Sequence, residues 1–140
     1  MALQHELDMT FNYEPVTYGE IKSGVSRPIG KDTKYYQLLC IAKDCDKSIA
    51  DILERTGNKR SGFTDKLAWD RDVLPTIKAN MSIYVAETKG MISKQDIIHA
   101  QTFPEDYDFG TANVGYICGM SVPPIMIKRI VQRLIESGVL

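Results

Sequence analysis

Residues 119–138 read GMSVPPIMIKRIVQRLIESG, and this stretch decides how the C-terminal part of the chain folds. Pro123 and Pro124 suit the first turn of a helix, where a missing backbone N–H costs little, and Gly138 suits its end. Between them, apolar residues recur every three or four positions, at Ile127, Ile130, Val131, Leu134 and Ile135. This spacing predicts one amphipathic helix with an apolar stripe on one side and charged residues on the other.

The remainder of the chain predicts short helices and short strands. The helices are expected at 17–24, where Thr17 and Glu20 have capping-box spacing, at 33–42 with Asp32 or Thr33 as cap, at 46–57 with Asp46 as cap, at 93–101 with Ser93 and Asp96 as a capping pair, and at 113–118. The strands are expected at 63–69, 76–79 and 82–85, with a turn at 26–30 and a basic loop at 58–62. These elements predict the α/β or α+β class, with a small mixed lobe followed by C-terminal helices.

Length and composition fit a single globular domain. The chain has 140 residues, of which 44% are hydrophobic and 25% charged, as in ordinary soluble proteins. Its apolar runs are shorter than the ~20 residues of a membrane span, and no signal-peptide pattern is recognised. We therefore expect a cytoplasmic protein without a membrane partner. The formal net charge of −1 is unusual for a protein that binds nucleic acid, because phosphate contacts come mainly from Lys and Arg.

The three cysteines, Cys40, Cys45 and Cys118, do not have the spacing of metal ligands. We expect them to be reduced and mostly buried. No metal site and no catalytic nucleophile are expected among them.

Four blocks in a fixed order resemble one enzyme family. They are KLAWD at 66–70, LPTI at 74–77, QTFP at 101–104, followed by EDYDF, and GMSVPP at 119–124. In this order they resemble the C-terminal end of the DNA cytosine-C5 methyltransferases, in which QTFP is similar to a Gln-Gly-Phe-Pro turn and GMSV to a Gly-Asn-Ser-Val block. The resemblance implies a target-recognition region at 14–89 and the C-terminal segment of a Rossmann-like catalytic domain at 90–140.

The part of such an enzyme that carries the chemistry is absent from this sequence. In the family, a cysteine that follows a proline attacks the flipped-out cytosine, and S-adenosylmethionine supplies the methyl group. None of the three cysteines follows a proline, and the family's glycine-containing cofactor loop is missing. The resemblance therefore implies a chain that does not catalyse alone, whose partners are double-stranded DNA and a catalytic methyltransferase chain or domain.

Five residues are candidate site residues, and the resemblance implies three of them. Thr76 matches a threonine that touches the DNA backbone, which suits a hydroxyl group. Ser121 and Val122 match the block that completes the methionine side of the S-adenosylmethionine pocket. Lys59 and Arg60 form the best candidate basic patch for DNA phosphates.

Two functional interpretations stay open from the sequence. The first is the recognition portion or small subunit of a split methyltransferase, and the second is a DNA-binding module or methyltransferase remnant without a catalytic role. The apolar stripe at 127–135 likewise has two interpretations. Either it is the core of this domain, or it is an interface that leads the chain to self-associate, to fold the helix back, or to bind a catalytic chain.

Overall fold

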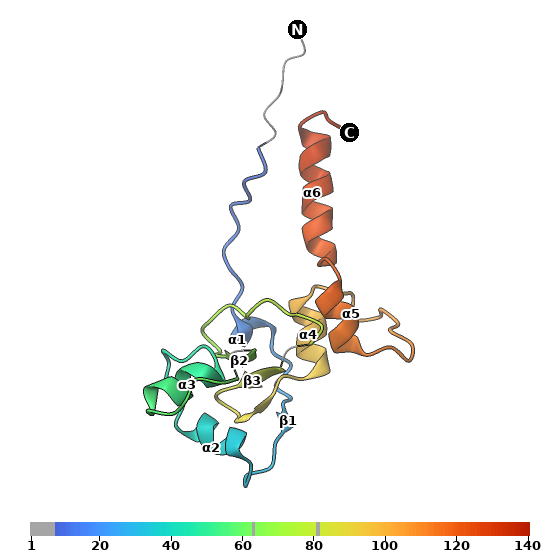
Figure 1. Ribbon diagram of the computed structural model, residues 1–140. Helices are drawn as coiled ribbons and strands as arrows, with labels where there is room; N and C mark the ends of the chain where they lie inside the picture. Colours follow the sequence, from blue (N-terminus) through green and yellow to red (C-terminus); the bar gives the residue numbers. More distant parts are fainter. Residues whose placement is uncertain (1–7, 63, 81) are drawn as a thin grey trace.

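The computed structural model describes residues 8–62, 64–80 and 82–140. Over these residues the chain forms a mixed α/β fold with a four-stranded sheet in the order β1-β4-β3-β2 (Figure 1). The strands are β1 (Arg27–Pro28), β2 (Asp65–Ala68), β3 (Ser82–Val85) and β4 (Gly90–Met91). The two pairings of β3 differ in direction, since β2 runs parallel to β3 and β4 runs antiparallel to it. The expected mixed α/β or α+β class is confirmed at this level.

Strand β1 lies where a turn was expected. It pairs antiparallel with β4, with Arg27 opposite Met91 and Pro28 opposite Gly90. The proline is tolerated because β1 is the edge of the sheet, where the absent N–H interrupts no ladder. Gly90 is required at this pairing, because a Cβ there would lie 2.7 Å from the Arg27 carbonyl oxygen. The prediction of a turn at 26–30 was therefore wrong. Since β4 lies just after residue 89, the two expected regions share one sheet.

The six helices of the described residues are all close to their expected positions. They are α1 (Tyr18–Ile21), α2 (Lys34–Cys40), α3 (Ile49–Arg55), α4 (Lys94–Ala100), α5 (Val114–Met120) and α6 (Pro124–Glu136). Side-chain caps begin several of them. Thr33 and Ser93, as expected, and Asn113, which was expected inside its helix, each accept a hydrogen bond from a first-turn backbone N–H. The capping box of Thr17 and Glu20 is also confirmed.

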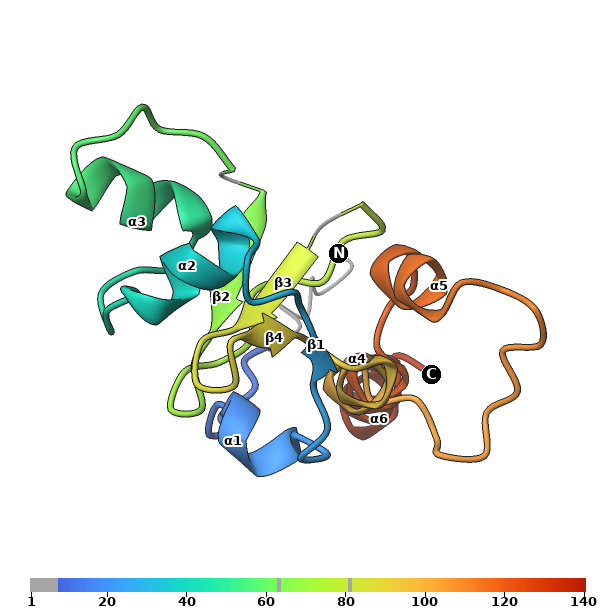
Figure 2. The same cartoon turned by 90° about the horizontal axis from the view of Figure 1, so that it is seen from below.

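The helices cover both faces of the sheet (Figure 2). Side chains alternate in direction along β2 and β3, so each strand contributes to two apolar clusters. One cluster joins the sheet to α2 and α3 through Leu38, Leu39, Ile49, Ile52, Leu53, Leu67 and Tyr84. The other joins it to α1, α4 and the 74–77 segment through Tyr18, Ala68, Ile77, Ile83, Val85 and Ile92.

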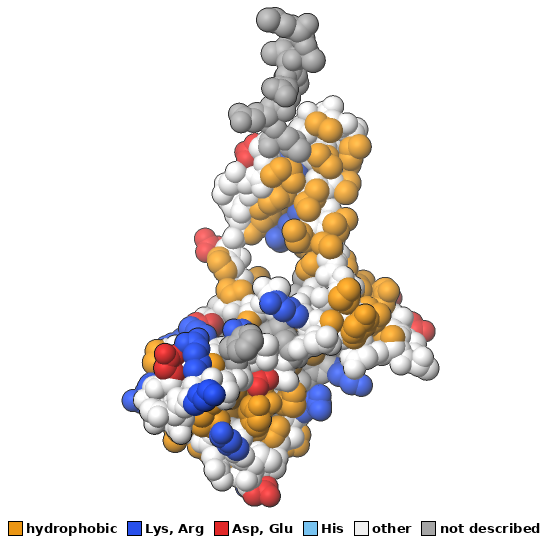
Figure 3. All heavy atoms as spheres, in the orientation of Figure 1, with side chains coloured by type: hydrophobic (Ala, Val, Ile, Leu, Met, Phe, Trp, Pro, Cys, Tyr) orange, Lys and Arg blue, Asp and Glu red, His pale blue; other side chains and the backbone are white. Residues whose placement is uncertain are grey.

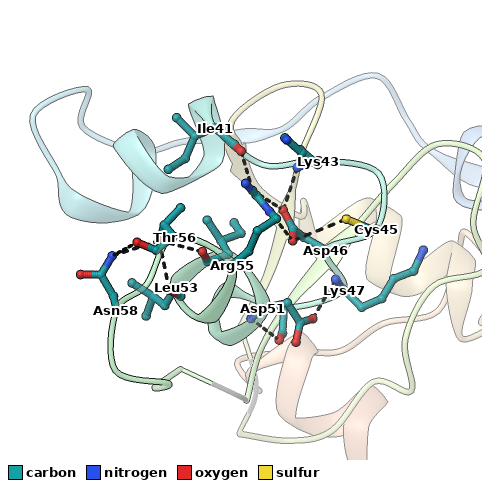
Figure 4. A network of polar contacts seen from close by, with 12 residues as sticks. Ile41, Lys43, Cys45, Asp46, Lys47, Asp51, Leu53, Arg55, Thr56 and Asn58 are labelled. Atoms are coloured by element: carbon teal, nitrogen blue, oxygen red, sulfur yellow. Dashed lines mark hydrogen bonds and ion pairs between the residues drawn. The ribbon is translucent and has the colours of Figure 1, made fainter.

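A buried carboxylate takes a different role from the one that the sequence predicted (Figure 4). Asp46 does not cap α3, because Ser48 does so by accepting from the Asp51 backbone N–H. Asp46 is instead buried and accepts from Arg55 Nε at 3.1 Å and Arg55 Nη2 at 2.8 Å. Burial alone raises the pKa of Asp46, but the bonds from Arg55 and the Lys43 backbone N–H together lower it below its usual value.

A second buried carboxylate, Asp96, ties α4 to α1. It accepts from the Tyr18 hydroxyl and from the Ser23 backbone N–H, both at 2.7 Å. Burial raises the pKa of Asp96, yet these hydrogen bonds together outweigh burial and lower it. For Tyr18, burial and the bond to Asp96 both act in one direction and raise the pKa of the phenol. The sequence predicted Asp96 only as a capping partner of Ser93.

Three further expectations need correction. No strand forms at 76–79, because this segment belongs to the extended connection that links the parallel strands β2 and β3. The strand expected at 63–69 is shorter, and Phe63 lies outside the described residues. Of the cysteines, only Cys118 is buried, and Cys40 and Cys45 are exposed.

Helix α6 extends away from the rest of the molecule (Figure 1). None of its residues is buried, and Ile127, Val131 and Ile135 are among the exposed large apolar side chains. The interpretation of the stripe as the core of this domain was therefore wrong.

The two buried aspartates make the stability of the fold pH-dependent. Because their pKa values are lower in the folded chain than in the unfolded chain, their contribution is present above the unfolded value of about 3.9 and disappears as pH falls through the folded values. We expect urea-unfolding free energies to fall below about pH 4. Asp46→Asn should lower the free energy of unfolding by about 3 kcal/mol at pH 7. It should also weaken the decrease of this free energy at acid pH. An unchanged acid limb in both Asp46→Asn and Asp96→Asn would contradict the assignment.

Candidate DNA and cofactor interface

The 74–77 segment presents one candidate site residue on the surface. Ile77 is buried in the sheet cluster, while the preceding Thr76 is exposed. Extended backbone explains the difference, because successive side chains point in opposite directions. Thr76 is therefore positioned by its buried neighbour Ile77, and its side chain is exposed at the surface.

Helix α5 approaches the end of this segment without any intervening side chain. A Cβ placed on Gly119 would lie 2.3 Å from the Ala79 backbone nitrogen and 2.4 Å from the Lys78 carbonyl carbon. Only glycine permits backbones to come this close. The contact therefore places α5 against residues 78–79, which directly follow the 74–77 block, although the two segments are far apart in the sequence.

A hollow of 480 Å³ lies beside this contact. Its walls come from the 73–77 segment, the end of α4 and the junction between α5 and α6. Thr76 and Ser121 both line it, together with the apolar side chains of Leu74 and Pro75. The structure therefore brings one DNA candidate and one cofactor candidate to the same hollow.

The two cofactor candidates differ in what they offer. The Ser121 hydroxyl donates to the Ile117 carbonyl oxygen at 2.6 Å, so its proton is already used within α5. Val122 presents an exposed apolar side chain. Neighbouring Met120, which stands where the family has asparagine, is 67% exposed and cannot donate hydrogen bonds. Of these residues Ser121 lines the hollow, whereas Val122 and Met120 do not.

Two residues after α4 were not singled out as site residues from the sequence. Gln101 is 8% exposed and lines the hollow, and its Oε1 has no hydrogen-bond partner among the described residues. Thr102 has a φ of 56°, in the left-handed region that favours glycine. Its Oγ1 accepts from the Ile125 backbone N–H at 3.2 Å and so caps α6 from the end of α4. The QTFP block contained a signal for this turn, because the Gln-Gly-Phe-Pro turn that it resembles has glycine where this chain has Thr102.

The basic loop lies elsewhere. It follows α3, which is at the opposite end of the molecule from α5 in Figures 1 and 2. Arg60 is ion-paired with Glu54 and lies 3.5 Å from Asp51, so much of its charge is neutralised locally. Lys59 is exposed, and no ion pair joins it to another residue of the described part of the chain. On the face shown in Figure 3, Lys and Arg side chains gather over the α3 side.

Comparisons of this chain with protein-family models, with curated proteins and with solved structures find no match.

The contact at Gly119 predicts a position-specific effect within α5. Gly119→Ala should destabilise the fold by about 1–3 kcal/mol, because the new methyl group meets backbone that cannot move aside cheaply. Gly115→Ala in the same helix is the matched control, since its Cβ would meet only the Asn113 Oδ1 at an ordinary 3.4 Å. The control should be neutral or stabilising. Equal unfolding free energies for the two variants would show that α5 does not pack in this way.

Proposed function

We propose that this chain is the DNA-recognition and C-terminal portion, or the small subunit, of an S-adenosylmethionine-dependent DNA (cytosine-5-)-methyltransferase, inactive alone. The observation that carries the proposal is the backbone contact at Gly119. That contact lies against residues 78–79, just after the block that resembles the family's Pro-Thr-Ile segment, and one hollow beside it is lined by Thr76 and by Ser121 of the block that resembles Gly-Asn-Ser-Val. A chance similarity of short blocks gives no reason for them to meet in space.

The conformation of Thr102 supports the same proposal. The family's Gln-Gly-Phe-Pro turn has glycine at this position, and here the backbone adopts the left-handed conformation that glycine favours. Asp96 adds to this support, since in the family the corresponding block organises the recognition region. Its carboxylate bonds to Tyr18 and Ser23 at the start of that region.

In the proposed function, Thr76 and Lys59 contact DNA. An exposed hydroxyl on an anchored segment positions a phosphate oxygen, and an exposed ammonium group neutralises it. Arg60 contributes less, because Glu54 and Asp51 already pair with it. Because the net charge of the chain is −1, most of the phosphate contacts would come from the catalytic part.

Ser121 and Val122 would form one wall of the S-adenosylmethionine pocket, completed by the catalytic part of a Rossmann-like domain. The bound cofactor would supply the methyl group. In this chain, the hydrogen bond from Ser121 to Ile117 orients the serine oxygen as an acceptor.

A non-catalytic DNA-binding module or methyltransferase remnant is the second candidate. The exposed Met120 favours it, because methionine cannot donate the hydrogen bonds that the family's asparagine could offer a cofactor at that position. A neighbouring reading frame that encodes the Pro-Cys and cofactor-loop blocks would favour the split enzyme.

We also propose a cytoplasmic location. Residues 114–136 are long and apolar enough to span a membrane by length and composition, and only 6% of the 18-residue apolar window within them is buried. In the structure they form two separate helices, α5 and α6. Four charged residues also lie on α6, at Lys128, Arg129, Arg133 and Glu136. Burying charges in a bilayer is costly.

The chain alone should transfer no methyl group. Incubation of the purified protein with labelled S-adenosylmethionine and cytosine-containing duplexes should give background label only, because neither a cysteine preceded by proline nor the cofactor loop is present. Labelled cytosine, in a preparation free of other methyltransferases, would contradict the proposed function.

DNA binding by the chain should be weak and should decrease steeply with salt. Removing one cation that pairs with a phosphate should lower the slope of log K against log salt by about 0.9. Lys59→Glu should therefore weaken duplex binding for all sequences and flatten the salt dependence, and Arg60→Glu should do so less. Thr76→Val keeps the branched shape and removes the hydroxyl, which should cost about fivefold in affinity. Fluorescence anisotropy with labelled duplexes measures all three. Tight binding at physiological salt, unaffected by these changes, would exclude the assigned contacts.

A further inference from the structure

A second, smaller cavity lies between β1, the β2–β3 connection and the helices α4 and α5 (Figure 2). Its volume is 220 Å³. Among the residues that the structure describes, only Ile77 lines both this cavity and the hollow beside Thr76. We call it the basic pocket, because three positively charged side chains line it, those of Arg27, Lys78 and Lys94.

The three cations reach the basic pocket from three separate parts of the chain. Arg27 belongs to β1, Lys78 to the connection between β2 and β3, and Lys94 to the first turn of α4. The pairing of β1 with β4 and the buried neighbours Ile77 and Ile92 hold these segments in place. The three residues are far apart in the sequence, so only the tertiary fold brings their charges together.

The lining of the basic pocket carries charge of one sign. No Asp or Glu is among the described residues that line it. None of the ion pairs between described residues involves Arg27 or Lys94, whereas Lys22 and Lys47 are paired with aspartates elsewhere on the surface. In a chain whose net charge is −1, a cavity lined by cations without acidic residues attracts an anion.

The other walls of the basic pocket strengthen this attraction. The buried Ile83 and Ile92 and the partly buried Ile97 supply apolar walls, and walls of low dielectric constant focus the field of nearby charges. Asn113 also lines the pocket. Its Oδ1 already accepts from the Tyr116 backbone N–H at 3.1 Å, so its amide nitrogen remains as a hydrogen-bond donor.

We propose that the basic pocket binds the terminal phosphate group of a small phosphate monoester. Arg and Lys are well suited to hold phosphate oxygens. All three cations line one small cavity, so a single group meets them together. Near pH 7 a monoester phosphate carries a charge of about −1.5 to −2, which is more than the single charge of a carboxylate or of a phosphodiester.

The volume limits which part of the ligand enters. Pockets that enclose a whole drug-sized ligand measure about 300–1,000 Å³, and the basic pocket measures 220 Å³. The phosphate group and the atoms next to it therefore enter, while the remainder of the ligand stays outside. Because Arg27, Lys78 and Lys94 are exposed, each ion pair contributes little, and we expect a dissociation constant on the order of a millimolar.

This inference does not rest on the proposed function. The basic pocket is separate from the hollow beside Thr76 and from the loop at 58–62. Failure of methyl transfer or of DNA binding would leave it unchanged. Contact with the phosphodiester backbone of DNA is the competing interpretation of the same cations.

Methyl phosphate and dimethyl phosphate, titrated into the ¹⁵N-labelled whole chain at constant ionic strength and about pH 8, test the class of ligand. The monoester is then doubly charged. It should shift the amide signals around Arg27, Lys78 and Lys94 and should bind about fivefold more tightly than the diester, because it carries one further charge. Equal affinities of the two esters, or no saturable shifts around these residues with the monoester, would overturn the proposal.

Matched variants test the residues. Lys94→Gln should weaken the binding of methyl phosphate at least several-fold, and Lys94→Arg, which keeps the charge, should retain it. Lys128→Gln on α6 removes the same charge away from the pocket and should bind like the wild type. Arg27→Gln, on another element, should act like Lys94→Gln and keeps the test decisive if the change at Lys94 disturbs α4. Equal weakening by Lys94→Gln and Lys128→Gln would reveal a general charge effect and overturn the site.

A blunt duplex without terminal phosphates tests the competing source, because all its phosphates are diesters. We expect that it leaves methyl phosphate bound in the basic pocket. If this duplex displaces methyl phosphate and shifts the amide signals of Arg27 and Lys94 instead, the pocket contacts the DNA backbone and the assignment to a phosphate monoester is overturned.

Discussion

The close approach of α5 to the β2–β3 connection constrains much of the molecule. Because Gly119 has no side chain, the α5 backbone lies directly against Lys78 and Ala79. This contact fixes where α5 stands, and so where α6 begins and how the hollow beside Thr76 is closed on one side. Because Gly119 has no Cβ, the segment at 119–122 lies close enough to the 74–79 segment for Thr76 and Ser121 to line one hollow.

Two buried carboxylates hold the short helices of the lobe together. Asp46 joins α3 to the end of α2 through Arg55, and Asp96 joins α4 to α1 through Tyr18. A buried carboxylate is tolerated only when hydrogen bonds replace its lost hydration, and both aspartates have several donors. The aspartates therefore specify the arrangement of these short helices, which have little apolar surface individually.

Local signals in the sequence predicted the local structure well. The caps at Thr17, Thr33 and Ser93 predicted three helix starts, because a side-chain oxygen next to free backbone N–H groups is a short-range effect. Contacts between distant residues were not predictable in this way. The edge position of Pro28, the pairing of Asp46 with Arg55, and the neutralisation of Arg60 by Glu54 and Asp51 all depend on tertiary placement.

The candidate site shows the same division. The sequence indicated Thr76 and Ser121 separately, and only the structure places them at one hollow. The central claim is that the surface around Thr76 and the loop after α3 bind DNA. The most direct measurement is a nuclear magnetic resonance titration of the ¹⁵N-labelled chain with a cytosine-containing duplex at low salt. We expect amide shift changes concentrated in residues 58–62 and 73–78. Changes confined to α6, or none at any duplex concentration, would contradict this claim.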